Sequence, residues 1–540
     1  MFDRLPFSPV IDDRIIVVSA TNFFDSHIDP TSDSAFGAAT YCHYPEVTIC
    51  APGYYITTGT TYIEVFNPNV TYPGYKEIWG GTSASTPIVS GVCALMKSIN
   101  PNLTVAEVKA IIQATADPII DEYMYPGLLG AGRINAYKAV KAVNDCYTEP
   151  VLEKNITTNV TCSEPMRTSD TITIHNGAVL TINSTLKCAE NVCIIVKPGG
   201  KLVVSNGILK NGCIENTWQG IIVEGTSTQS QMGNNLNQGI VYLNNAVIEN
   251  AICGIKVGDQ SDLSKSGGIV YATNTTFKNC KNAVLFAPYR NMNNNVEFAN
   301  RSKFTKCNFL VNNDFYTSGM FFDSHAKLLG VNGISFTGCS FTNTQTNLNP
   351  SARRYASSGI SAINSGFSVQ PKCFSNVASG EVCAIPYVDV PSVFSGLDYG
   401  IVIQDAGTMN QVKISSTQFS NNYFGVYVSG LDNVKLLNND FAVGKSSPNF
   451  ISNPCGVYFK NASNFRIEEN RFSKYSNFQG LPFGLQIKSS GIDNNVVYKN
   501  QFFELEIAQN FVGANYWMPL PHEGLKSLCN EHESINKYHY

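Results

Sequence analysis

The feature that most constrains the fold is an imperfect repeat of roughly 25–32 residues in the last two thirds of the chain. A glycine followed by alternating apolar residues begins each copy of one motif: Gly220, Gly254, Gly400, Gly425, Gly456 and Gly484. A second motif, F-x-x-C, begins at Phe277, Phe304 and Phe336. Such self-similarity is the signature of an architecture built from stacked units.

A solenoid explains both motifs. Each coil contributes short parallel strands, and equivalent residues of successive coils stack on one another. The recurrent Asn and Gly suit tight corners that need left-handed backbone angles. We expect Cys280, Cys307 and Cys339 to form an interior ladder in step with phenylalanine. The pattern resembles right-handed parallel β-helix domains of the pectate-lyase-like type, which implies about twelve coils over residues 171–515.

The first quarter of the chain has the pattern of an α/β domain. The β-branched run at 15–20 predicts a buried strand of a parallel sheet, and V-T-I-C-A-P-G at 47–53 predicts a second one. Residues 85–100 are apolar on nearly every side, which predicts a helix buried all round, with Pro87 in its first turn. T-V-A-E from Thr104 is a capping box, which predicts the start of another helix.

Ser83 lies at the beginning of the first of these helices, within G-T-S-A-S-T-P. Free N–H groups and the helix dipole favour developing negative charge there, which suits a nucleophile. The spacing alone favours an ordinary N-cap serine, which is far commoner. The segment resembles the nucleophile signature of subtilisin-like serine peptidases, and the A-P-G strand and G-A-G-R-I-N-A at 130–136 follow in that family's order. The resemblance implies the C-terminal part of a subtilase domain over residues 1–145. It also implies that Ser83 attacks a protein or peptide substrate and that its own N–H is an oxyanion donor.

The groups that would activate this serine are absent from the sequence. Subtilases place Asp in D-[ST]-G and His in H-G-T, and neither tripeptide occurs here, nor is there room for the family's oxyanion Asn. Only His27 and His43 precede Ser83, and we interpret both as ordinary surface or turn histidines rather than catalytic bases. We therefore expect a fragment of a peptidase, inactive alone. A true pseudoenzyme with a vestigial Ser83 is the alternative.

Composition excludes several classes of function. The net charge is −4 and only 14% of residues are charged, which argues against nucleic acid and anionic membrane surfaces as partners. No apolar run is long enough to span a bilayer. Cys50 and Cys93 fall in apolar elements and should be buried. Two pairs are close enough in sequence for disulfides: Cys188 with Cys193, and Cys373 with Cys383. No C-x-x-C occurs, and we expect no metal or other cofactor.

The expected organisation is multi-domain. A partial α/β subtilase domain at 1–145 is followed by a linker at 146–170, an all-β parallel β-helix at 171–515 and a tail at 516–540. N-N-D at 438–440 should form a corner of a coil.

Arg466, near Glu468 and Glu469, is the nearest candidate for a lyase site, although a solvated charged face is the favoured interpretation. Two alternatives to a peptidase therefore stay open. One is a non-catalytic adhesin or carbohydrate-binding solenoid that binds a surface polysaccharide or glycan, and the other is a polysaccharide lyase. No signal peptide opens the sequence, but the family resemblance implies a secreted or cell-surface protein.

Overall fold

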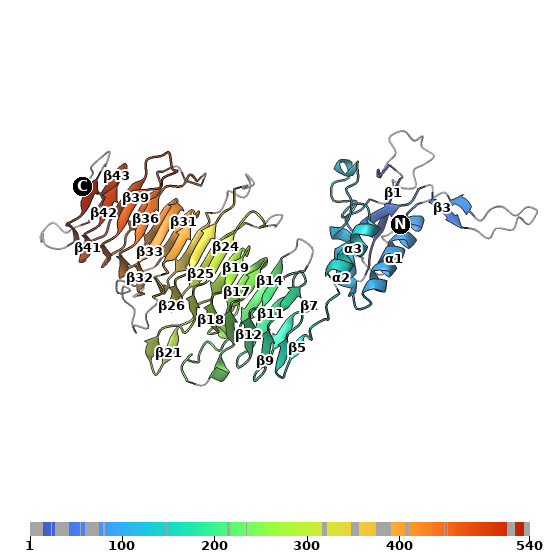
Figure 1. Ribbon diagram of the computed structural model, residues 1–540, viewed down its shortest axis with the longest axis horizontal. Helices are drawn as coiled ribbons and strands as arrows, with labels where there is room; N and C mark the ends of the chain where they lie inside the picture. Colours follow the sequence, from blue (N-terminus) through green and yellow to red (C-terminus); the bar gives the residue numbers. More distant parts are fainter. Residues whose placement is uncertain are drawn as a thin grey trace, which may run out of the picture. The chain divides into compact units, whose positions relative to one another are not determined.

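The chain forms two compact units, Met1–Pro150 and Val151–Tyr540 (Figure 1). The computed structural model describes the following residues: 15–22, 24–27, 43–54, 56–59, 75–78, 81–146, 148–212, 217–233, 235–315, 321–346, 356–373, 390–405, 410–447, 449–450, 452–515 and 524–533. Among these residues, no helix is long and apolar enough to cross a membrane.

The first unit combines a small parallel sheet with three α-helices. Strands β1 (Val18–Thr21) and β2 (Ile49–Pro52) pair in parallel, as the two apolar runs predict. The hairpin of β3 (Ile56–Gly59) and β4 (Tyr75–Ile78) follows. The helices are α1 (Thr82–Ile99), α2 (Val105–Ala114) and α3 (Ala136–Cys146), with a 3₁₀ turn at Glu122–Met124.

Helix α1 differs from the prediction in two respects. It begins at Thr82, so Pro87 is its sixth residue rather than part of the first turn, and the proline lacks the N–H that the Ser83 carbonyl would otherwise accept. It buries only the face that contains Val89 and Met96, while Leu95, outside this face, is 54% exposed. The expectation of a helix buried all round was wrong because the small residues between its large apolar ones do not require burial.

Helix α2 begins as predicted. The Thr104 hydroxyl accepts a hydrogen bond from the Glu107 N–H (3.2 Å), and Glu107 Oε2 accepts one from the Thr104 N–H (2.7 Å). This reciprocal pair is a complete capping box.

The second unit is a solenoid of three parallel sheets, each of 13 strands, and this confirms the predicted β-helix. Each coil runs from sheet I through sheet II to sheet III (Figure 1). Sheet I contains β6 (Val160–Cys162), β9 (Val179–Ile182), β12 (Lys201–Ser205), β15 (Ile240–Asn244), β18 (Ile269–Thr273), β23 (Lys303–Thr305), β26 (Asn332–Thr337), β29 (Gly366–Gln370), β32 (Val412–Ser415), β35 (Val434–Leu437), β38 (Arg466–Glu468), β41 (Asn495–Tyr498) and β44 (Leu525–Leu528).

Sheet II contains β7 (Met166–Thr168), β10 (Thr185–Cys188), β13 (Ile208–Asn211), β16 (Val247–Glu249), β19 (Thr276–Lys278), β24 (Asn308–Val311), β27 (Ser340–Asn343), β30 (Ser392–Ser395), β33 (Thr417–Asn422), β36 (Asp440–Val443), β39 (Arg471–Lys474), β42 (Gln501–Phe503) and β45 (Glu531–Glu533). Sheet III contains β5 (Asn155–Ile156), β8 (Ile172–Ile174), β11 (Cys193–Val196), β14 (Trp218–Val223), β17 (Ala251–Val257), β20 (Asn282–Phe286), β25 (Ser324–Leu329), β28 (Ser358–Ile363), β31 (Tyr399–Gln404), β34 (Phe424–Ser429), β37 (Cys455–Lys460), β40 (Phe483–Lys488) and β43 (Ile507–Val512). Outside the three sheets lie the hairpin of β21 (Asn291–Asn293) and β22 (Val296–Phe298) and two 3₁₀ turns, Asn235–Asn237 and Leu263–Lys265.

The coils extend beyond the limits expected from the sequence. Strands β5–β7 lie within residues 146–170, the expected linker, and β44 and β45 lie within 516–540, the expected tail. These end coils have polar sequences because more of their residues face outward, so their composition alone does not distinguish them from connecting segments.

A column of stacked phenylalanines runs through the interior of sheet II. Neighbouring rings lie nearly parallel, with centroids 4.5–5.0 Å apart. The members are Phe277, Phe309, Phe341, Phe394, Phe419, Phe441, Phe472 and Phe502. Offset-stacked rings are a favoured arrangement of aromatic side chains, and their burial contributes strongly to the core.

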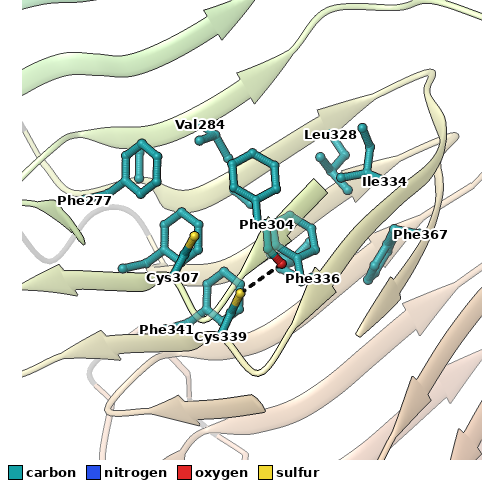
Figure 2. Close-up of a cluster of buried hydrophobic side chains, with 14 of the residues drawn as sticks. Phe277, Val284, Phe304, Cys307, Leu328, Ile334, Phe336, Cys339, Phe341 and Phe367 are labelled. Atoms are coloured by element: carbon teal, nitrogen blue, oxygen red, sulfur yellow. Dashed lines mark hydrogen bonds between the residues drawn. The ribbon is translucent and has the colours of Figure 1, made fainter. Parts of the chain in front are cut away.

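The F-x-x-C motif marks two places in the coil rather than one ladder. Phe277 belongs to sheet II, whereas Phe304 and Phe336 belong to sheet I and stack on each other at 5.1 Å (Figure 2). All three motif cysteines are buried, as expected. However, Cys280 follows sheet II while Cys307 and Cys339 follow sheet I, so a single cysteine ladder was the wrong prediction. The four-residue spacing recurs at both corners because both connect an inward aromatic to a buried turn.

The repeated glycines all lie in sheet III, as the glycine motif predicts. A Cβ atom on Gly425 would lie 2.5 Å from the Gly456 carbonyl oxygen and 2.7 Å from the ring of Phe441. Gly400, Gly456 and Gly484 face the same obstruction from the phenylalanine column. Glycine is therefore required where sheet III passes beneath the stacked rings.

The predicted corner at N-N-D is confirmed. Asn438 has a φ of 53°, and Asn439 begins a ladder of asparagines with Asn470, Asn500 and Asn530, of which the first three are buried. Each of the first three donates its backbone N–H to the side-chain oxygen of the next, at 2.9–3.0 Å. The ladder satisfies backbone groups that the turn would leave unpaired.

The two predicted disulfides have different outcomes. Cys188 and Cys193 are both free thiols, so that bridge was wrong. Cys188 ends β10 with its side chain in the core, and its sequence proximity to Cys193 reflects only the short corner between two strands. Cys373 is disulfide-bonded, and its expected partner Cys383 lies outside the described residues. Cys50 is buried as expected, whereas Cys93 is only partly buried.

We predict that Gly425→Ala destabilises the β-helix by about 1–3 kcal/mol, because the added methyl group overlaps backbone and ring atoms that are held by neighbouring coils. Chemical denaturation of the full chain measures the change. Ser361→Ala, on an outward-facing position of sheet III, is the control and should change stability by less than about 0.5 kcal/mol. Equal effects of the two substitutions would contradict the packing argument.

A second prediction concerns His325, which is buried in strand β25 between Phe322 and Phe341, with Nε2–H donating to the Thr342 carbonyl at 3.0 Å. Burial lowers the pKa of His325 to about 3. The neutral ring therefore stabilises the fold above pH 6.5, and this contribution is lost as pH falls toward 3. Between pH 6 and 4.5 we expect the free energy of unfolding of the parent to fall with each pH unit by up to about 1.4 kcal/mol more than that of His325→Gln. If the denaturation midpoints of the parent and of His325→Gln changed in parallel with pH, this pH dependence could not be assigned to His325.

Candidate active site

Ser83 is the second residue of α1 and is exposed to solvent. The helix begins after Gly81, whose carbonyl accepts the Ala84 N–H at 2.9 Å. Among the described residues, no acceptor is within hydrogen-bonding distance of the Ser83 backbone N–H or hydroxyl. The hydroxyl thus lies in the positive field of the helix N-terminus, beside an N–H that is available to an incoming anion.

The first turn of α1, which contains Ser83, is held against strand β2. The buried Ser85 hydroxyl donates to the Ala51 carbonyl of β2 at 2.9 Å, which attaches the first turn of α1 to the sheet. A Cβ atom on Gly53 would overlap the Ser85 hydroxyl and lie 2.8 Å from the Gly81 carbonyl oxygen. The glycine of A-P-G is therefore needed for this close approach. The sequence analysis did not assign roles to Ser85 and Gly53, although both lie inside its motifs.

The segment G-A-G-R-I-N-A is held against the same strand. The Cys50 N–H donates to the Gly132 carbonyl and the Ile134 N–H to the Cys50 carbonyl, both at 2.8 Å. Asp117 accepts hydrogen bonds from Lys138 (2.6 Å) and Arg133 (2.8 Å). These contacts, led by the Lys138 hydrogen bond, lower the pKa of Asp117 to about 2. The resulting charge cluster anchors the start of α3.

Neither histidine near the start of the chain supplies a base to Ser83. His27 is buried rather than on the surface, contrary to expectation, and its Nδ1–H donates to the Ala20 carbonyl at 3.0 Å. Its ring contacts His43 and Tyr125, with centroid separations of 5.6 and 5.1 Å. Burial lowers the pKa of His27. Both imidazoles belong to an aromatic cluster near the end of β1.

In the β-helix, Arg466 forms an ion pair with Glu468 two residues later, at 2.7 Å. Arg466 is exposed, and Glu469 takes a φ of 56° at the next corner. No group of three or more metal-ligating side chains occurs among the described residues. The arrangement fits the charged outer face that was favoured from the sequence.

Aromatic side chains gather on the outer face of sheet III. Tyr427 and Tyr458 occupy paired positions on neighbouring strands and stack at 5.0 Å. Tyr399 and Tyr427 line a shallow groove of about 240 Å³ that also contains Asp323 and Gln404. Aromatic rings beside carboxylate and amide groups provide both stacking surfaces and hydrogen-bonding groups for a ligand.

Comparison with known families finds two matched regions, one within each of the two compact units. Residues 11–147 match the subtilase family (Peptidase S8), and residues 390–516 match the right-handed β-helix region. The calcium-dependent protease of Trichormus variabilis is 35% identical over 153 residues, which cover 26% of this chain and 22% of that protein. The serine protease AprX of Bacillus subtilis is 30% identical over 139 residues, which cover 25% of this chain and 31% of that protein. The chain therefore spans less than a third of either relative.

A structural search finds the crystal structure of the periplasmic alginate epimerase AlgG, with a TM-score of 0.34 and 10% sequence identity. The match covers 70% of this chain and 78% of that one.

We predict that Gly53→Ala displaces the first turn of α1 and destabilises the first unit by about 1–3 kcal/mol. Hydrogen exchange of the full chain should become faster at residues 81–85, because the Ser85–Ala51 hydrogen bond is strained or broken. Gly91→Ala on the same helix is the matched control. A Cβ at Gly91 meets no atom within 4 Å, so alanine there should stabilise α1. Unchanged exchange at 81–85 would show that Gly53 does not position Ser83.

Proposed function

We propose that Ser83 is the nucleophile of a subtilisin-like serine endopeptidase, to which the subtilase region of this chain contributes the attacking hydroxyl and part of the oxyanion site. In the reaction, the Ser83 oxygen would bond to the carbonyl carbon of a peptide, and a base would take the hydroxyl proton. The scissile C–N bond would then break as that proton passes to the leaving amine. The Ser83 N–H would stabilise the oxyanion.

The observation that carries the proposal is the placement of Ser83 itself. An exposed hydroxyl at the N-terminus of α1 lies beside its own unpaired N–H, and Ser85 and Gly53 hold this turn against the A-P-G strand. An N-cap serine would instead use its side chain to accept a helix N–H. The Ser83 hydroxyl accepts none, and Gly81 occupies the cap position.

The proposed centre needs an Asp–His pair from a segment other than the described part of this chain. His27 and His43 are engaged with each other and with Tyr125, and the sequence contains no H-G-T or D-[ST]-G tripeptide. Without a base a serine hydroxyl is a poor nucleophile. We therefore expect the chain alone to be inactive.

For the second unit we propose a binding function directed at a glycan, on a secreted or cell-surface protein. The stacked Tyr427 and Tyr458 on the outside of sheet III support it, because such rings provide flat apolar surfaces for sugar rings. This function is independent of proteolysis, and it remains if Ser83 is vestigial.

We predict that a fluorophosphonate probe does not label the chain alone. It should label Ser83 when the chain is combined with a segment that carries the D-[ST]-G and H-G-T motifs of a subtilase, because the probe requires an activated hydroxyl. Mass spectrometry of the modified peptide is the measurement.

Ser83→Ala should abolish that labelling. Ser90→Ala, which removes another exposed hydroxyl of α1, should leave it unchanged. Strong labelling of the chain alone that disappears with Ser83→Ala would contradict the requirement for an external base.

A further inference from the structure

The outer face of sheet I carries cations on three successive coils. Strands β32, β35 and β38 pair in register, so that Lys413 lies directly opposite Lys435, and Lys435 opposite Arg466. Because neighbouring strands are about 4.8 Å apart, the three side chains begin within about 10 Å of one another. The two preceding positions of the same column are Ser335 and Ser368, so the run of cations is local.

A second column, of side-chain amides, runs beside the cations. Gln411, Asn433 and Asn464 each lie two residues before one of the cations, and the Asn464 side chain donates to that of Asn433. The members are Gln411, Asn433, Asn464 and Asn494. Both columns line one open groove of about 620 Å³, and no carboxylate is among its lining residues. We refer to it as the cation groove.

The charges of Arg466 and Lys435 are only partly balanced within the protein. Glu468 accepts from Nε and Nη2 of Arg466, at 2.8 and 2.7 Å, and Nη1 remains available to another acceptor. Lys435 is exposed between the other two cations, and no carboxylate of the described residues lies within ion-pair distance of it. Like charges directly opposite each other in a sheet are destabilising. An anion bound between cations of neighbouring strands would relieve this repulsion.

We propose that the cation groove binds a linear anionic polysaccharide that lies across the strands, with its carboxylate or sulfate groups against Lys413, Lys435 and Arg466. The amide column would donate to and accept from the sugar hydroxyls. Regularly spaced cations and amides match a polymer whose repeating unit carries both an anion and hydroxyls. The proposal deepens the glycan-binding part of the proposed function and rests on it, and it does not depend on Ser83.

The lining of the groove favours a polysaccharide over a single-stranded nucleic acid. Proteins that bind single strands stack the bases on exposed aromatic rings. The groove's aromatic residue, Phe367, is only 2% exposed and cannot serve as a platform.

The test is calorimetric titration of the full chain with four probes of similar length: an oligogalacturonate, a sulfated oligoglucan, a neutral oligoglucan and a single-stranded oligonucleotide. We expect binding of one or both anionic oligosaccharides, weakened by added salt. The double variant Lys413→Gln/Lys435→Gln should reduce that affinity at least tenfold and flatten the salt dependence. Lys303→Gln, an exposed lysine in the same column and outside the groove, is the matched control and should not change it.

The proposal would be overturned by tightest binding of the oligonucleotide, by equal binding of the neutral oligoglucan, or by equal weakening by Lys303→Gln. If the double variant still bound the anionic oligosaccharides as the parent does, the binding site would not be the cation groove, although the β-helix would still be a glycan-binding unit. Failure of every oligosaccharide to bind would refute both. Thermal denaturation of each variant shows that it is folded, and Ser83→Ala should bind as the parent does, which separates this result from the peptidase proposal.

Discussion

The structure of the second unit depends on stacking equivalent side chains coil upon coil. Each ring of the phenylalanine column in sheet II rests on the next at 4.5–5.0 Å, and at Gly400, Gly425, Gly456 and Gly484 of sheet III the rings leave no room for a Cβ. A coil that slipped by one residue would place every inward side chain outside. The coil length can therefore vary only at the corners, where insertions do not disturb the stacked columns. Stability in such an array is the sum of contacts between neighbours, so each coil must satisfy the coils above and below it.

The same constraint leaves the outward positions free to diverge. Sheet I carries serines at Ser335 and Ser368 but cations at Lys413, Lys435 and Arg466, on an unchanged backbone. Since outward residues also stack in register, a few substitutions on successive coils build an extended surface of one chemical character. A β-helix thereby separates its folding requirements from its binding surfaces more completely than a globular domain, whose loops must often serve both.

How much the sequence reveals depends on whether a residue is constrained by its neighbours. The glycines at 400, 425, 456 and 484 were assigned correctly to one repeated strand, but glycine is needed there because the stacked rings leave no room for a Cβ, and not because of a left-handed corner. Cys280 was placed in the wrong ladder because two corners of the coil share a spacing that only the strand register distinguishes. The cation groove was missed, apart from Arg466, for a related reason. Lys413 and Lys435 are separated by a whole coil whose corners vary in length, and nothing local shows that they face each other. Exposure of one side of α1 also escaped prediction, since small residues tolerate either environment.

The first unit shows which parts of a catalytic centre can be present without the whole. A helix N-terminus and a free N–H are properties of the local backbone, so they form wherever α1 packs on the A-P-G strand. A base must instead be brought to Ser83 by another element, and His27 is buried in contact with the Ala20 carbonyl. Residues that act as a catalytic unit lose most of their effect when one is missing. The preorganised turn around Ser83 is consequently compatible with a half-site that is stable, accessible and chemically silent until a histidine is supplied.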